Sequence, residues 1–252
     1  MTWSAQLAYA VGLIATDGCL VRDGRHIAFV TQDEDLMQVW LSCLGHKDRY
    51  RRSTSSAGTP VYRVQISDAR LYRWLLTLGL TPAKSLTLGA VAVPSAYFAP
   101  FVRGLLDGEG SIYVLRHRPT RSIYPDYWYE RLWTFFASAS LSHINWLRAS
   151  FAAEYGLTGW IETTHRPPRN EFYRLKYGKR DSLVLLAVLY ADVNVPACNG
   201  RKTSGWDFWR GTVPKGGFEP PSPFERYPLK VVRLPFRHFG SELQFYREAS
   251  RE

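Results

Sequence analysis

The chain has 252 residues, of which 46% are hydrophobic, enough for one large domain or two domains of about 100 residues with packed cores. Its net charge of +10 indicates a polyanionic partner, and arginine supplies 25 of the 32 basic residues, which favours nucleic acid because guanidinium groups suit phosphates and guanine edges. No apolar stretch approaches the length of a membrane span, and the first residues do not resemble a secretory signal. The three cysteines are isolated and match neither a disulfide framework nor a zinc motif. We therefore expect a soluble, intracellular protein of the cytoplasm, nucleoid or an organelle.

The chain begins with an apolar run, Leu7 to Ala15, that predicts a buried helix with Ser4 as its N-cap. After Gly18 the patterns predict two strands, a helix, two strands and a helix. These six elements span Cys19 to Arg22, His26 to Gln32, Asp33 to Leu44, Arg49 to Arg52, Val61 to Ile66, and Ala69 to Leu78. Asp23-Gly24 is a favourable hairpin turn, and residues 81–94 connect to the remainder of the chain.

A second apolar run at about residue 102 is followed by the same order of elements. These span Ser111 to Arg116, Arg131 to Ser138, Ser142 to Tyr155, Trp160 to Thr164, Phe172 to Tyr177, and Asp181 to Tyr190. From Thr212 onward the sequence is rich in Pro, Phe and Arg with little periodicity. We therefore predict an N-terminal half at 1–93, a C-terminal half at 94–211 and an irregular tail at 212–252.

Two segments at a distance of 92 residues resemble each other, Ala10 to Gly18 and Val102 to Gly110. Each is an apolar, helix-like run with a glycine inside it, Gly12 in the first and Gly104 in the second. A glycine costs a helix about 1 kcal/mol relative to alanine, so a reason for keeping it is the close approach of another backbone. The natural partner for each helix is the other copy.

Both segments end in an acid followed by glycine. We expect Gly18 and Gly110 to adopt the left-handed conformation that stops a helix. Asp17 and Glu109 would then lie at helix C-termini, where the negative end of the dipole disfavours a carboxylate unless a cation compensates. Carboxylate and carbonyl oxygens together suit a hard cation such as magnesium or calcium. An ordinary solvated turn explains one such copy well, but two copies at matching positions favour a shared cation site.

The paired segments resemble the motifs of the LAGLIDADG homing endonucleases in their single-chain, two-repeat form, over roughly residues 5 to 210. This resemblance implies an α+β fold with two pseudo-symmetric αββαββα halves, whose saddle-shaped antiparallel sheets flank paired central helices. It also implies that Asp17 and Glu109 hold divalent metal ions, with the carbonyls of Thr16 and Gly108 as further ligands. The expected metal is Mg²⁺, and Ca²⁺ is expected to support binding without cleavage.

The resemblance assigns further catalytic positions. Lys84 and Lys202, each in a loop after the last helix of its half, match a basic position near the metal site that stabilises charge or polarises water. Gln32 matches a position that orders water at the metals, and its counterpart in the second half falls near Ala139. The alternative for each lysine is a solvated loop residue.

The predicted strands carry basic and polar residues suited to the major groove, where a ten-residue strand spans about 33 Å, or roughly ten base pairs. The alternative for any one of them is a solvated strand residue. The DNA-binding candidates are Arg25, Arg51, Arg52, Tyr62, Arg63, Gln65, Tyr113, Arg116, Arg118, Arg131, Arg169, Arg174 and Lys176.

These features favour a monomeric, divalent-metal-dependent endonuclease that cuts both strands of a long, asymmetric double-stranded DNA target. Two alternatives stay open. The first is a maturase that assists splicing of its host intron RNA, since members of this family are often intron-encoded. The second is a DNA-binding regulator that does not cut. Intact Asp17 and Glu109 favour cleavage over both.

Overall fold

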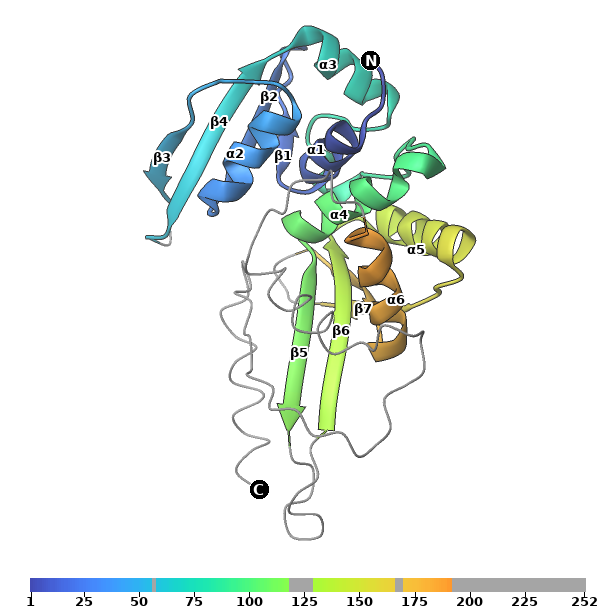
Figure 1. Cartoon of the computed structure of the whole chain (residues 1–252). Helices are drawn as coiled ribbons and strands as arrows, with labels where there is room; N and C mark the ends of the chain where they lie inside the picture. Colours follow the sequence, from blue (N-terminus) through green and yellow to red (C-terminus); the bar gives the residue numbers. More distant parts are fainter. Residues whose placement is uncertain (56–57, 118–128, 166–169, 192–252) are drawn as a thin grey trace.

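The computed structural model describes residues 1–55, 58–117, 129–165 and 170–191 (Figure 1). Its elements form two halves with the same order, αββαββα, as the sequence predicts. The first half contains α1 (Ala5–Thr16), β1 (Gly18–Leu20), β2 (His26–Thr31), α2 (Glu34–Cys43), β3 (Arg51–Thr54), β4 (Pro60–Ser67) and α3 (Ala69–Thr77). The second contains α4 (Phe98–Gly108), β5 (Ser111–His117), β6 (Tyr129–Ser138), α5 (Leu141–Tyr155), β7 (Trp160–Thr164), β8 (Phe172–Tyr177) and α6 (Lys179–Leu189).

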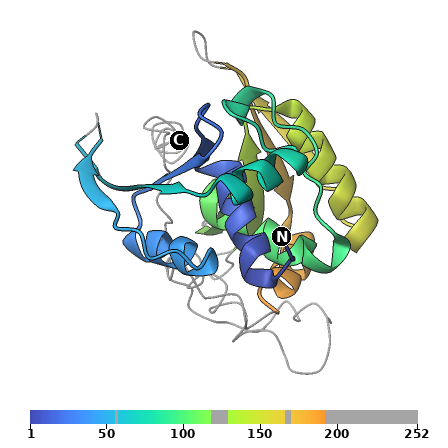
Figure 2. The same cartoon turned by 90° about the horizontal axis from the view of Figure 1, so that it is seen from above.

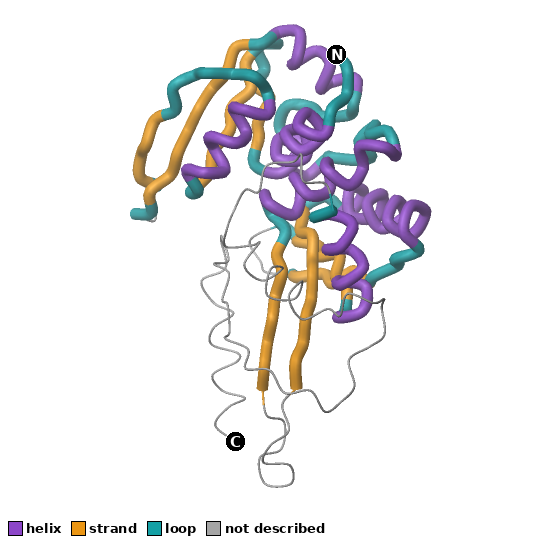
Figure 3. Tube along the Cα trace, in the orientation of Figure 1, coloured by secondary structure: helices purple, strands orange, loops and turns teal. Residues whose placement is uncertain are grey.

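Each half has one four-stranded antiparallel sheet, ordered β1-β2-β4-β3 in the first and β5-β6-β8-β7 in the second. Helices cover one face of each sheet (Figure 3). Phe29 of β2 stacks on Trp40 of α2, and Phe136 of β6 packs against Phe151 of α5. The chain is therefore an α+β protein in which, among the described residues, each sheet has one face that helices cover and one face that they leave open.

Polar side chains cap four of the helices, among them the predicted cap Ser4. The Leu7 backbone N–H donates to Ser4 Oγ at 3.1 Å, and the Leu71 N–H donates to Asp68 Oδ1 at 2.8 Å. Asp33 and Ser140 cap α2 and α5 in the same way. Because a side-chain cap satisfies a backbone donor that has no partner inside the helix, these polar residues fix where each helix begins.

The two glycine-bearing helices, α1 and α4, cross at the centre of the molecule and join the halves (Figure 2). A Cβ on Gly12 would overlap the carbonyl oxygen of Phe101, and a Cβ on Gly104 would overlap that of Tyr9. The same Cβ on Gly12 would lie 2.9 Å from the Gly104 Cα. Each contact repeats the other at an offset of 92 residues, so the packing is pseudo-twofold. The predicted backbone approach is confirmed.

The predicted conformation of Gly18 and Gly110 is wrong, because neither has a positive φ. The chain passes directly from each helix into a strand, β1 or β5. Glycine is needed for space: a Cβ on Gly18 would lie 2.6 Å from the Ile14 Cα, and one on Gly110 would lie 2.6 Å from the Leu106 Cα. These contacts also repeat at an offset of 92 residues.

The connection between halves runs from α3 to α4 and includes the predicted boundary at residues 93 and 94. Gly79, with φ of +95°, ends α3, and two short 3-10 helices follow, η1 (Lys84–Leu86) and η2 (Ser95–Tyr97). The predicted tail at 212–252 lies outside the described residues. In the described part, the longest helix is α5 with 15 residues, and no helix has the length and apolarity of a membrane span.

Candidate functional site

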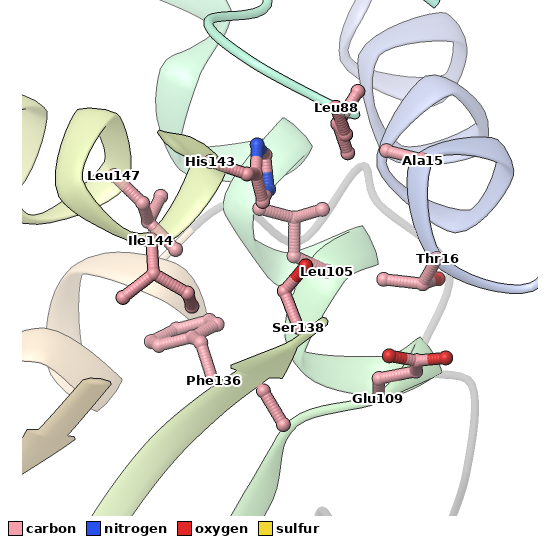
Figure 4. A pocket seen from close by; sticks show the side chains of 11 residues that line it. Ala15, Thr16, Leu88, Leu105, Glu109, Phe136, Ser138, His143, Ile144 and Leu147 are labelled. Carbon is pink, nitrogen blue, oxygen red and sulfur yellow. The ribbon is translucent and has the colours of Figure 1, made fainter. Parts of the chain in front are cut away.

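The two acids of the repeated segments occupy equivalent positions at the ends of the central helices. Asp17 is the C-cap of α1, and Glu109 is the C-cap of α4. The helix ends touch, because a Cβ on Gly108 would overlap the Thr16 hydroxyl and lie 2.8 Å from the Thr16 Cβ. Figure 4 shows the Glu109 carboxylate beside the Thr16 side chain. The acid of one half therefore lies at the helix end of the other.

Lys84 is buried, with 5% of its surface exposed, and it lies at the same place. Its ammonium donates a hydrogen bond to the Gly18 carbonyl oxygen at 2.5 Å. Burial lowers the pKa of Lys84, while electrostatic attraction to Cys19, Glu109 and Asp17 acts in the opposite direction. The ammonium therefore interacts electrostatically with the acids of both halves.

Backbone strain accompanies this placement. Ala83, directly before Lys84, has φ of +57° and is the one non-glycine residue with positive φ in the described part of the chain. A left-handed non-glycine residue costs about 1–2 kcal/mol. This conformation begins the short helix η1, from which the Lys84 ammonium reaches the Gly18 carbonyl oxygen.

The donors at this site suit a hard divalent cation. Asp17 and Glu109 provide carboxylate oxygens, and the carbonyls of Thr16 and Gly108 lie in the last helical turns, where helices leave carbonyls without intrahelical partners. Oxygen donors of this type are those that magnesium and calcium prefer. No group of three or more His, Cys, Asp or Glu side chains that could hold a metal ion occurs in the described ranges, here or elsewhere, so the site depends on two carboxylates with backbone carbonyls. The chemistry of the donors therefore fits the expected cation.

The second of the repeated segments contains a further acid, Asp107, two residues before Glu109, and its environment is different. Asp107 is buried, accepts a hydrogen bond from the Tyr9 hydroxyl at 2.9 Å, and lies 3.9 Å from the Arg103 guanidinium. Its counterpart in the first half is Ala15. Asp107 thus joins the helices through a buried polar contact, away from the acids at their ends.

A small pocket adjoins the site and is lined by Glu109, Thr16, Ser138 and His143, together with apolar side chains of α4, α5 and β6 (Figure 4). His143, to which the sequence assigned no role, is buried and its ring lies 2.9 Å from the Gly89 carbonyl oxygen. Burial lowers the pKa of His143, the bond to Gly89 opposes this, and the charge of Lys84 lowers it further. Gln32 directly follows β2 and is half-buried, and Ala139 follows β6 at the equivalent point.

The register separates the first-half DNA-binding candidates into two groups. Residues opposite each other on antiparallel strands share a face, so Arg51, Arg63 and Gln65 lie on the helix-free face. Tyr62 and Arg52 share the other face, where the hydroxyls of Tyr62 and Tyr50 contact the Glu34 carboxylate of α2. Arg25 is exposed in the turn between β1 and β2. The structure therefore does not bring Arg52 and Tyr62 together with the other candidates.

Four of the second-half candidates, Tyr113, Arg131, Arg174 and Lys176, share the helix-free face of their sheet. Tyr113 stacks on Trp133 at 5.5 Å, and the Arg131 guanidinium lies 5.6 Å from the Trp133 ring. Arg174 and Lys176 follow on β8. Arg116 lies in β5, whereas Arg118, Arg169 and Lys202 fall outside the described residues.

Sequence reasoning missed three residues on this face, Trp133, Trp160 and Glu162. The register places Trp160 opposite Lys176 and Glu162 opposite Arg174. The alternation along Trp160–Thr164 could have grouped Trp160 with Glu162, but the short strand does not indicate which side helices cover.

The arrangement of the halves matches solved structures. I-SmaMI bound to uncleavable DNA is similar with a TM-score of 0.54 and 13% identity, over 81% of this chain and 89% of that chain. I-DmoI in complex with DNA and Ca is similar with a TM-score of 0.50 and 15% identity, over 81% of this chain and 97% of that chain. The chain has the LAGLIDADG homing endonuclease fold. The N-terminal LAGLIDADG domain of DUF199/WhiA gives a TM-score of 0.48 and 15% identity, over 75% of this chain and 84% of that chain.

Sequence comparison adds no family assignment. No protein-family model matches the chain, and no curated protein matches it. The likeness to solved structures, at these low identities, concerns the fold alone.

Proposed function

We propose that this protein is a site-specific endonuclease that cuts both strands of a long, asymmetric double-stranded DNA target. The observation that carries the proposal is the contact between the ends of α1 and α4, which brings one acid from each half to a common place beside Lys84. A site on the pseudo-twofold axis between two basic halves suits cleavage of two strands. Since one chain provides both acids, we propose that it acts as a monomer.

Asp17 and Glu109 would hold magnesium, with the carbonyls of Thr16 and Gly108 as additional ligands. Bound magnesium would supply an activated water and stabilise the charge that develops on the phosphate and leaving oxygens. Lys84 offsets the charge of the two carboxylates and keeps them close in spite of their mutual repulsion. We propose the same role for Lys202 in the second half, and a water-ordering role for Gln32.

The helix-free sheet faces would contact the DNA. Arg51, Arg63 and Gln65 in the first half, and Arg131 and Lys176 in the second, are suited to base edges and phosphates, whereas Arg174 is buried beside Glu162. The net charge of +10 supports a polyanionic partner. A strand of ten residues, such as β6, is about as long as ten base pairs.

The test is selection of cleaved sites from a random duplex library in magnesium. Asp17→Asn and Glu109→Gln should abolish cleavage while duplex binding in calcium persists, because each change removes a metal ligand without changing shape. Asp35→Asn is the matched control, since Asp35 is exposed on α2 on the helix-covered side of its sheet. It should cut at the wild-type rate.

Other outcomes would overturn the proposal. Cleavage at the wild-type rate by either site variant would show that these acids are not the ligands. Sequence-specific binding with no cleavage in magnesium would identify a regulator instead. Selective binding of structured RNA with no duplex binding would favour the maturase.

A further inference from the structure

Among the described residues, the helix-free face of the second sheet carries one acid within a group of cations. Glu162 of β7 lies opposite Arg174 of β8 in the register, and Lys176 is the next residue of β8 on that face. The Lys176 ammonium lies 2.7 Å from Glu162 Oε2, and the Arg174 guanidinium lies 3.4 Å from the same oxygen. Both contacts use one carboxylate oxygen, and 40% of the Glu162 side chain is exposed.

The pseudo-symmetric position in the first half has the opposite charge. Arg63 of β4 lies opposite Arg51 of β3, as Arg174 lies opposite Glu162. An arginine thus occupies the first-half position where the second half has Glu162. The two faces would therefore meet different chemical groups even though their strands are arranged alike.

A carboxylate on such a face fits a base edge better than the DNA backbone. It repels phosphates, and when ionised it can only accept hydrogen bonds. In the major groove the available donors are the amino groups of cytosine and adenine. Adenine places the acceptor N7 beside its amino group, which repels a carboxylate, whereas cytosine presents the amino group alone. The neighbouring Lys176 can donate to O6 and N7 of the paired guanine.

We propose that Glu162 is a specificity-determining residue that reads one C·G pair in the half-site under the second sheet. Glu162 accepts a hydrogen bond from the cytosine amino group, and Lys176 donates to the guanine of the same pair. The contact of Glu162 with Lys176 and Arg174 orients the carboxylate before DNA arrives. This assignment rests on the proposed binding of duplex DNA by the sheet faces.

The test compares wild type and Glu162→Gln by selecting bound duplexes from a random library in calcium, so that binding alone is scored. Wild type should require cytosine at one position of the half-site. Glu162→Gln should lose that preference by about fivefold or more, and favour adenine there because a glutamine amide matches its N6 and N7. Preferences at other positions should persist.

Glu154→Gln is the matched control. Glu154 lies on α5, on the other side of the sheet, where Oε1 accepts a hydrogen bond from Ser95 at 2.7 Å. Its selected sites should equal those of wild type. If Glu162→Gln keeps the cytosine requirement, or loses affinity equally for all sequences, the assignment of Glu162 is overturned, but the proposed function is not. If wild type selects no duplex sequence, the proposed function fails together with it.

Discussion

Replacement of Gly12 by alanine tests whether backbone contact between α1 and α4 joins the two halves. The new Cβ would overlap the Phe101 carbonyl oxygen and lie 2.9 Å from the Gly104 Cα, and both are backbone atoms that cannot rotate away. Overpacking of this kind costs about 1–3 kcal/mol, and we expect the upper end. Alanine returns about 1 kcal/mol of helix propensity. The net loss in free energy of unfolding should be about 1–2 kcal/mol.

Urea unfolding followed by tryptophan fluorescence measures this loss, since the chain has nine tryptophans. For a chain of this size, each kcal/mol also lowers the melting temperature by about 2–4 °C. The control is Gly89→Ala, because Gly89 has no positive φ and a Cβ there meets only the Ser142 hydroxyl oxygen, at an ordinary contact distance of 3.6 Å. Its free energy of unfolding should change by less than about 0.5 kcal/mol.

The sign of the change decides the outcome. If the helices were separate, Gly12→Ala would gain helix propensity and become more stable than wild type, which would refute the proposed contact. A double variant with Gly104→Ala adds a second check. Since both glycines meet in one contact, the two losses should not add.

Two further predictions concern the site. Lys84→Met should lower the cleavage rate about 100-fold with duplex binding intact, because the acids lose their buried cation. The control is Lys179→Met on α6, which should cut at the wild-type rate. An unchanged rate for Lys84→Met would exclude a role of Lys84 in cleavage. Because burial lowers the pKa of His143 below its ordinary value of 6.5, the unfolded chain takes up a proton first as pH falls. The free energy of unfolding should therefore decrease below pH 6.5, and this decrease should be smaller in His143→Gln; identical pH profiles for the two proteins would contradict the prediction.

Local sequence was sufficient for the order of the elements. The apolar period of Leu7 to Ala15, the Ser4 cap and the Asp23-Gly24 turn depend on neighbours within a few residues, so they can be recognised without tertiary information. Local rules failed at Gly18 and Gly110, where glycine is required by crowding against the preceding helix and φ stays negative.

The face of each strand residue depended on register. Alternation groups Arg63 with Gln65 and places Tyr62 on the opposite face, but it does not indicate which face the helices cover. Tyr62 was therefore grouped with the groove candidates although its hydroxyl contacts Glu34 of α2. Glu162 was missed for the same reason, since its importance depends on the cations of a neighbouring strand.

The sequence by itself determined that the chain contains two copies of one motif, each with an internal glycine and a terminal acid, because a repeat is visible wherever its residue spacing is kept. Only the tertiary structure decided that the two glycine-bearing helices meet backbone to backbone and that the buried Lys84 ammonium is attracted to both acids. Such contacts join residues up to 95 positions apart, and their geometry depends on the packing of whole helices, which local sequence patterns do not describe.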